Sequence, residues 1–516
     1  MTRDGTAIVQ RLAANSLFVT VSLGITTVAG LVVSVMLARF LGPTDYGQYS
    51  FMMWLIGILA LIANLGLGNT AVRFVAEYRV RDITVAVAFI RNIISIQLAV
   101  SLFLALLLST YGVLFSSDPW LFILAAGVMV PMVLYRLASS IVSGLQKYDV
   151  LTIVGAITTP IQIILFVVAL VKGGGVLGIL TVIIGIELLK LVLCYRFVDR
   201  QIHQDGPIAP GNLDREEIRR VFGFASTIFL LSLLDSIVWE KSEVFFLKWF
   251  WDLDTVAFYS IAFGLTFMLY RLPATISNVL LPTFSEAVGA DDQDVLTKGF
   301  YVSTKYLCLL ASAMGVWAFV ISPELIAILY GPLYADAVPV FRLLVAAGSI
   351  VACARPGSSI LLGTEHHKFV LRITAILAII NIALDVALIP LLGAMGAAMA
   401  NSLVQISGIV VGLTFVLWRL HFPFPTTDVL KIYGSAIFAG GMIHLMGNFL
   451  SGNTYFVISI FAFTGFYVMA LRLVRPWSAL DQRIFAVILE KIPRRLQILL
   501  CLVQLSLGVE SSRPGQ

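Results

Sequence analysis

The sequence predicts an all-α polytopic membrane protein with about fourteen transmembrane helices. Of its 516 residues, 59% are hydrophobic and only 12% are charged, and the mean hydropathy is +0.97. Soluble globular domains contain about 45–50% apolar and about 25% charged residues. So apolar a composition excludes a water-soluble protein, a disordered chain, a nucleic-acid-binding protein and a secreted scaffold held by disulfides.

Fourteen apolar stretches are long enough to cross a bilayer, which requires about 20 residues per helix. Polar residues, glycine or proline separate these stretches. The predicted spans are 15–38, 48–67, 92–112, 120–143, 151–171, 176–198, 221–247, 255–280, 301–329, 338–362, 369–391, 394–419, 430–450 and 453–473.

The distribution of lysine and arginine predicts the orientation of these spans. With the N-terminus in the cytoplasm, 25 of the 34 basic residues fall in cytoplasmic segments or at the cytoplasmic ends of spans, and four fall on the outer side. The positive-inside rule expects such an excess. We therefore predict a multi-pass protein of the plasma (inner) membrane with both termini in the cytoplasm.

Short motifs recur along the chain at a nearly constant spacing. The segment 136–144 matches 355–363, and the segment 168–178 matches 386–396, at offsets of 219 and 218 residues. These matches indicate that spans 7–12 repeat spans 1–6 in the same order. Because six is an even number, the two lobes have the same orientation, as in transporters built from parallel repeats.

This organisation divides the chain into six predicted parts. They are a cytoplasmic tail (1–14), an N-lobe (15–198), a cytoplasmic inter-lobe loop (199–220), a C-lobe (221–420), two additional spans (421–473) and a cytoplasmic or interfacial tail (474–516). Within the last part, Leu496–Val509 is too short to span and is interpreted as an interfacial segment.

Five stretches carry a likeness to a known family. They are LARFLGPTDYGQY at 37–49, VAFYSIA at 256–262, LPTFS at 281–285, LYG at 329–331, and NIALD at 381–385 running on to GAMGAA at 393–398. In this order they resemble polysaccharide flippases of the multidrug/oligosaccharidyl-lipid/polysaccharide (MOP) exporter superfamily. The resemblance implies a MATE-like, V-shaped transporter of two six-helix lobes. It also implies that an undecaprenyl-diphosphate-linked oligosaccharide is moved outward by alternating access, for the synthesis of O-antigen, capsule or a related surface polysaccharide. The implied partners are this lipid-linked substrate, membrane lipids, and polysaccharide polymerases and glycosyltransferases.

Cationic residues within the spans are the candidate substrate-binding groups, because a charge at mid-membrane costs about 2.5–3.5 kcal/mol on insertion scales. The candidates are Arg136, Arg355, Arg271 and Lys241. Arg271 comes just before Pro273, where a broken backbone is expected to face a cavity. Arginine binds a diphosphate through paired hydrogen bonds. Two alternatives stay open: Arg136 and Arg355 snorkel to the inner surface, and Lys241 is neutralised by Glu240 and Glu243.

Acidic residues within the spans are fewer. Asp235, Glu240, Glu243 and Asp385 are candidate coupling or lumen acids, and a helix-packing hydrogen bond explains Asp385 equally well. Glu187 is the only acid well inside spans 1–6, and its spacing from Lys190 predicts an ion pair on one helix. The sequence predicts no cofactor and no metal site, and it leaves open whether Na⁺ or H⁺ couples transport.

Three functions compete for this sequence. A flippase for lipid-linked oligosaccharides fits the cationic spans and is not an enzyme. A cation-coupled multidrug exporter of the same fold needs a carboxylate in its first lobe, where acids are scarce. A membrane-embedded glycosyl polymerase or ligase needs a large outer loop, and all the outer loops are short.

Overall fold

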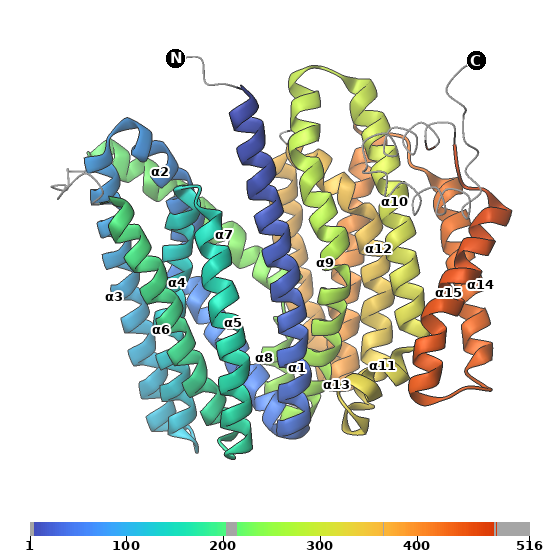
Figure 1. Cartoon of the computed structure of the whole chain (residues 1–516), viewed down its shortest axis with the longest axis horizontal. Coiled ribbons are helices and arrows are strands. Elements are labelled where there is room, and N and C mark those ends of the chain that lie inside the picture. The colour runs from blue at the N-terminus through green and yellow to red at the C-terminus, as the bar shows by residue number, and fades with distance from the viewer. Residues whose placement is uncertain (1–4, 203–213, 365, 479–480, 482–516) are drawn as a thin grey trace. The chain divides into compact units, whose positions relative to one another are not determined.

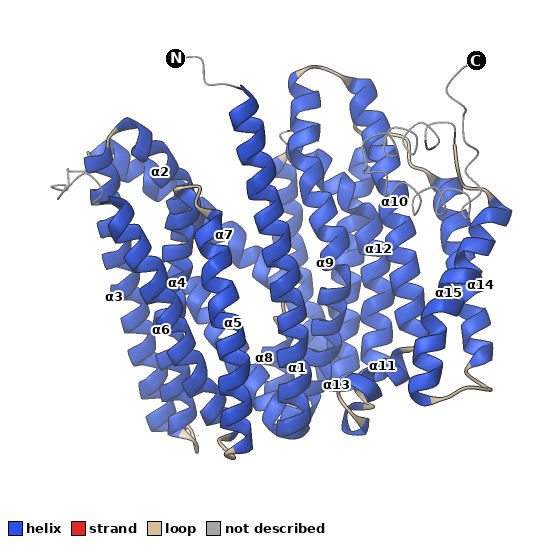
Figure 2. Cartoon of the chain, viewed as in Figure 1, coloured by secondary structure: helices blue, strands red, loops and turns tan. Residues whose placement is uncertain are grey.

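The computed structural model describes residues 5–202, 214–364, 366–478 and 481, and every regular element in these ranges is a helix (Figure 1, Figure 2). The interfacial segment predicted at Leu496–Val509 lies outside them. The elements are α1 (Gly5–Asn64), α2 (Leu67–Arg81), α3 (Ile83–Phe115), α4 (Pro119–Gly144), α5 (Tyr148–Val171), α6 (Gly175–Ile202), α7 (Arg215–Trp239), α8 (Glu243–Phe250), α9 (Leu253–Gly289), α10 (Gln293–Val320), α11 (Ser322–Leu329), the 3₁₀ helix η1 (Pro332–Tyr334), α12 (Ala337–Gly363), α13 (His367–Trp418), α14 (Thr426–Met446) and α15 (Gly452–Val474).

Twelve helices in the described part of the chain are long and apolar enough to cross a membrane. The prediction of an all-α polytopic membrane protein is therefore confirmed, but the number of candidate spans differs from fourteen. The difference arises at two long helices, α1 and α13. Each of them contains two of the predicted spans and one glycine with a non-helical backbone.

The chain reverses within α1 at Gly42, whose φ is 76° and which precedes Pro43. The hydroxyls of Ser34 and Tyr46 lie 3.0 Å apart on either side of this glycine. Twelve residues of continuous helix would separate them by about 18 Å. The two segments of α1 therefore fold back on each other, and a left-handed backbone at the turn suits glycine because it lacks a Cβ atom.

The chain also reverses within α13, at Gly393, whose φ is 55°. A Cβ atom added to Gly396 would lie 2.4 Å from the carbonyl oxygen of Leu388. Farther along, a Cβ on Gly408 would lie 2.7 Å from Cδ1 of Leu377. Contacts that spread symmetrically from Gly393 define an antiparallel helical hairpin.

The span predicted at 221–247 is interrupted. Helix α7 ends at Trp239 and α8 begins at Glu243, so residues 240–242 are not helical. The chain divides into two compact units, Met1–Ala257 and Phe258–Gln516, and α7 and α8 pack against α1 and α2 in the first. The assignment of spans 1–6 and 7–12 to two lobes stays a prediction.

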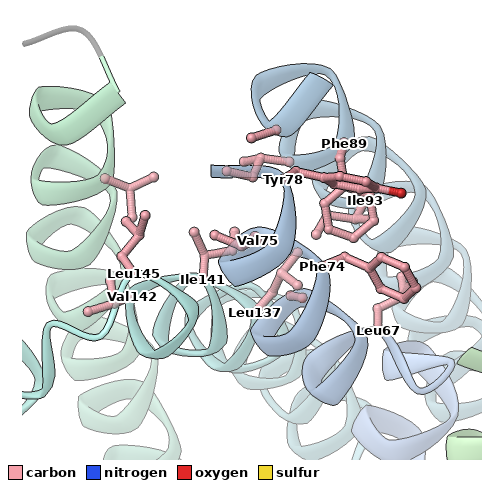
Figure 3. Close-up of a cluster of buried hydrophobic side chains, with 14 of the residues drawn as sticks. Leu67, Phe74, Val75, Tyr78, Phe89, Ile93, Leu137, Ile141, Val142 and Leu145 are labelled. Atoms are coloured by element: carbon pink, nitrogen blue, oxygen red, sulfur yellow. The ribbon is translucent and has the colours of Figure 1, made fainter. Parts of the chain in front are cut away.

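Helix α2 lies in a segment that the sequence analysis treated as a loop. It is amphipathic and places Phe74 and Tyr78 in a buried cluster with Phe89 of α3 and Leu137 of α4 (Figure 3). Its polar face carries Arg79, whose Nη1 donates a 2.8 Å hydrogen bond to the carbonyl oxygen at the C-terminal end of α4. Apolar residues spaced at i and i+4 in the sequence indicate such an amphipathic helix, but its fifteen residues are too few to cross a bilayer.

Helix α9 is continuous from Leu253 to Gly289, so the broken backbone expected at Pro273 is absent. Proline removes one helical hydrogen bond, but the flanking turns keep helical geometry. The argument that placed Arg271 beside an unwound segment is therefore wrong. The position of Arg271 has to be argued from its neighbours instead.

Candidate functional site

Arg136 and Arg355 occupy equivalent positions on their helices. Arg136 precedes the last residue of α4, Gly144, by eight residues, and Arg355 precedes the last residue of α12, Gly363, by the same number. Each arginine is therefore about 12 Å from its helix end. Arg136 belongs to the first compact unit and Arg355 to the second.

The two arginines differ in exposure. Arg136 is exposed, whereas Arg355 is half-buried. The Nε atom of Arg355 is buried and makes no hydrogen bond to any described residue. A buried guanidinium nitrogen without an acceptor is costly, and an acidic ligand would satisfy it.

Helices α9 and α12 run parallel within the second unit. The hydroxyls of Ser277 and Ser359 are 3.3 Å apart, and a Cβ on Gly348 would lie 3.4 Å from Cγ2 of Thr266. Both contacts join residues that are 82 positions apart in the sequence, so α9 and α12 run in the same direction with a constant register. Closer to the N-terminal ends of both helices, the Tyr270 hydroxyl donates a 2.7 Å hydrogen bond to the carbonyl oxygen of Val345 on α12.

This register places Arg271 and Arg355 at nearly the same level. The residue of α12 opposite Arg271 is Cys353, two positions before Arg355, which corresponds to about 3 Å along the helix axis. Both side chains are half-buried. The sequence predicted both residues as candidates, but it carries no information on their relative positions along the two helix axes.

Neither guanidinium has an acidic partner in the described residues. The ion pairs of the second unit that involve described side chains join Lys298 to Asp294 and Lys305 to Asp428 and Asp481. Arg271 and Arg355 also make no side-chain hydrogen bond to another described residue. Because they lie at one level and have no carboxylate partner among the described residues, Arg271 and Arg355 are candidates for binding an anion.

The charges predicted on the seventh span cluster around the α7–α8 break. Asp235 and Glu240 are exposed, and Glu240 accepts a 3.4 Å hydrogen bond from Ser236. Glu243 is fully buried and interacts electrostatically with the half-buried Lys241. This arrangement favours neutralisation of Lys241 in place, so its substrate-binding role is the weaker of the two predictions.

Asp385 lies in the hairpin of α13. It is fully buried, as is Asn381 one turn earlier. The reversal at Gly393 brings the second arm alongside, where Asn401 is 2% exposed and accepts a 2.8 Å hydrogen bond from Gln405. Asp385 is thus one acid among carboxamides inside a membrane helix pair, where a polar side chain stabilises packing or holds a cation.

The remaining charged pair within the spans is confirmed. Lys190 Nζ lies 2.9 Å from Glu187 Oε1 on α6, as the spacing of three residues predicted. The described residues contain no cluster of three or more histidine, cysteine, aspartate or glutamate side chains that could hold a metal ion.

Comparison with known families identifies the chain. The profile of the family described as "Polysaccharide biosynthesis protein" matches residues 12–288, more than half of the sequence, and the profile described as "MatE" matches residues 236–387. The chain belongs to the polysaccharide biosynthesis protein family. The sequence predicted a transporter, and solved structures with the same fold are transporters.

Solved structures show the same fold at low sequence identity. The chain is similar to the lipid II flippase MurJ in an inward closed conformation, with a TM-score of 0.71, 16% identity, and coverage of 89% of this chain and 98% of that chain. It is also similar to an inward-facing multidrug resistance MATE family transporter, with a TM-score of 0.65, 15% identity, and coverage of 79% and 98%. A third similar structure, a MOP superfamily transporter from Pyrococcus furiosus, has a TM-score of 0.55, 16% identity, and coverage of 80% and 95%. No curated protein matches the chain.

Proposed function

We propose that the protein is a flippase that moves an undecaprenyl-diphosphate-linked oligosaccharide across the plasma membrane by alternating access, for surface polysaccharide synthesis. The observation that carries this proposal is the pair Arg271 and Arg355, level with each other on α9 and α12 and without an acidic partner in the described residues. Guanidinium groups bind phosphate oxygens through paired, charge-assisted hydrogen bonds. A diphosphate offers enough oxygens to engage both residues.

Membership of the polysaccharide biosynthesis family supports the same substrate class. One of the similar structures is a lipid II flippase, which shows that this fold is compatible with a lipid-linked sugar substrate. Arg136, at the matching position on α4, is proposed as a further diphosphate-binding residue. The substrate and the membrane lipids are the proposed partners, with polymerases and glycosyltransferases acting after and before transport.

We also propose fourteen membrane crossings with both termini in the cytoplasm. Twelve candidate spans, of which α1 and α13 each fold back at a glycine, support that number. An even number of crossings returns the chain to its starting side, in agreement with the excess of lysine and arginine in the predicted cytoplasmic segments.

The coupling ion is proposed to act at the acidic residues within the spans, none of which forms an ion pair with Arg271 or Arg355 in the described residues. Asp385 is buried among carboxamides that could share a Na⁺ ion or hydrogen-bond a protonated carboxyl group. Asp235, Glu240 and Glu243 at the α7–α8 break are the other candidates. A multidrug exporter would instead use such acids to bind a cationic substrate, and the unpartnered arginine pair is an unsuitable surface for one.

Reconstitution of the full chain tests the proposal. Proteoliposomes would contain a fluorescent polyprenyl-diphosphate oligosaccharide, and a membrane-impermeant glycosidase would report the glycans that reach the outside. A flippase increases the cleaved fraction beyond the outer-leaflet share, and the Arg271→Ala variant should not. Uptake of ethidium by the same vesicles, with no glycan movement, would instead support the multidrug exporter.

A further inference from the structure

The most completely bonded charge cluster of the second unit lies outside the arginine pair, around Lys305 of α10. The side chain of Lys305 is only 1% exposed, although its helix position is near the predicted cytoplasmic end. Its Nζ donates 2.5 Å hydrogen bonds to Asp481 and to the carbonyl oxygen of Pro476, and it lies 3.1 Å from Asp428. The buried ammonium group therefore has two hydrogen-bond acceptors and a second carboxylate within ion-pair distance.

The acceptors come from two parts of the chain distant from α10. Asp428 is in the first turn of α14, whereas Pro476 and Asp481 follow the end of α15. Two tyrosines of α10 donate further hydrogen bonds to these carboxylates. The hydroxyl of Tyr306 donates to Asp481 over 3.0 Å, and that of Tyr301 donates to Asp428 over 3.0 Å. Helix α10, helix α14 and the residues after α15 thus all contribute to the cluster.

The segment after α15 is itself folded around Asp481. The backbone N–H and the hydroxyl of Ser478 both donate to Asp481 Oδ2, over 2.7 and 2.8 Å. The ring of Trp477 lies 5.5 Å from Lys305 Nζ. Burial raises the pKa of Asp481, but the hydrogen bonds from Lys305 and Ser478 outweigh it and hold the pKa below its usual value. Asp481 therefore stays charged at neutral pH.

The α14–α15 hairpin is attached to α10 at a second level as well. Deeper along the helices, the hydroxyls of Tyr467 and Ser312 are 3.1 Å apart, and Trp317 Nε1 donates to Ser459 over 3.3 Å. Apolar residues of α14 and α15 pack around Ile321, next to the end of α10. These contacts fix the middle of the hairpin, and the Lys305 cluster fixes its end.

We propose that the described residues after α15, Pro476 to Ser478 and Asp481, form a strap that fastens the α14–α15 hairpin to α10, with Lys305 as its buried centre. The two spans outside the repeat are then a fixed part of the second unit. The contacts of that unit continue past the last span, through Pro476, Ser478 and Asp481. This inference does not depend on what the protein transports.

Hydrogen–deuterium exchange of the full-length protein in lipid nanodiscs tests the strap, because the backbone N–H of Ser478 is protected by its hydrogen bond to Asp481. Lys305→Met leaves buried carboxylates without their cation, and exchange over residues 476–481 should become roughly a hundredfold faster. Exchange at the start of α14 should rise with it. Lys298→Met is the matched control, since Lys298 is on the same helix and its pair with Asp294 is exposed; it should leave both segments unchanged.

A second variant covers the case in which Lys305→Met does not insert. Asp481→Asn removes the charge of the strap but leaves Lys305 beside Asp428, so it should release residues 476–481 while α14 stays protected. Unchanged exchange over residues 476–481 in whichever variant inserts would overturn the proposal. Transport is not the readout, so the result is independent of the flippase assay.

Discussion

Ser277 and Ser359 place their hydroxyls 3.3 Å apart, and Ser359 also donates a 3.2 Å hydrogen bond to the carbonyl oxygen of Ser277. This contact and the packing of Tyr270 against Gly348 hold α9 and α12 in register. Arg271 lies between these two contacts in sequence. The spacing of the two candidate substrate-binding arginines therefore depends on close approach of the helices, which small residues permit.

Gly348→Ala tests the importance of that close approach. The new Cβ would lie 2.6 Å from Cε2 of Tyr270, so the ring or the helix must shift. We expect a loss of stability of about 1–3 kcal/mol and a lower transport rate. Gly264→Ala on α9 is the control, because a Cβ at that position has no atom within 4 Å. Thermal unfolding in detergent measures both, and equal melting temperatures would contradict the expected overlap.

Substitution of Arg271 tests whether its planar guanidinium binds the substrate. Arg271→Ala should abolish polymer export while the amount of protein in the membrane is retained. Arg271→Lys should recover only part of the activity, because lysine keeps the charge and loses the paired hydrogen bonds. Export assays with membrane immunoblots separate the two effects. If Arg271→Ala removes the protein from the membrane, the residue is structural and the substrate proposal weakens.

The hairpin in α13 gives a topology test. If the chain reverses at Gly393, cysteines introduced at Lys368 and Arg419 should react with a membrane-impermeant maleimide from the same side, and one at Leu392 from the opposite side. The background replaces the native cysteines at 194, 308, 353 and 501. Reaction of positions 368 and 419 from opposite sides would mean a single crossing and only twelve or thirteen spans.

The ion pair between Arg220 and Glu77 predicts a dependence of stability on pH. The guanidinium nitrogens of Arg220 on α7 lie 2.6 and 3.0 Å from the carboxylate of Glu77 on α2, and this hydrogen bonding lowers the pKa of Glu77. A carboxyl group whose pKa is lowered by folding stabilises the protein fully at pH values above its unfolded-state pKa, which is about 4.3 for glutamate. That contribution is lost as pH falls through the folded-state pKa.

Glu77→Gln should therefore lower the melting temperature slightly at pH 7, because the pair is partly exposed. The difference from the unmodified protein should shrink as pH falls below about 4.3. Asp294→Asn, which disrupts a more exposed pair on α10, is the comparison and should have a smaller effect. A Glu77→Gln difference that stays constant from pH 7 to about pH 3 would exclude an ionic contribution.

The sequence predicted the helices better than it predicted their partners. Hydropathy located the segments of α3 to α6 and of α14 and α15, because a bilayer requires long apolar helices whatever their neighbours. It missed α2, whose arginines made it resemble a loop, although Phe74 and Tyr78 are buried. Periodicity within one segment carries no information on tertiary contacts.

The candidate site was predicted to a similar extent. Arg271 and Arg355 were identified from the cost of a charge in the membrane, but their common level depends on contacts such as Ser277 with Ser359, which join residues 82 positions apart. Lys305 was not singled out because it lies near a span end, where lysine is usually exposed. Its burial follows from residues 428, 476 and 481, which no local pattern connects to it.

The last prediction concerns the sign of the charge at position 355. Because Arg271 and Arg355 lie at one level, Arg355→Glu would place a carboxylate at the level of Arg271 and lower the positive charge of the candidate site. Export should stop, although both helices keep their contacts through the serine pair. Arg136→Glu should also stop export if the equivalent position on α4 binds the diphosphate, and the double Glu variant should not recover. Arg91→Glu, an exposed arginine on α3, is the control and should export normally. Binding of a soluble diphosphate analogue to the purified variants measures the site directly: affinity should fall for positions 136 and 355 and not for position 91. Normal export by Arg136→Glu and Arg355→Glu would refute their role and leave snorkelling to the membrane surface as the explanation of both arginines.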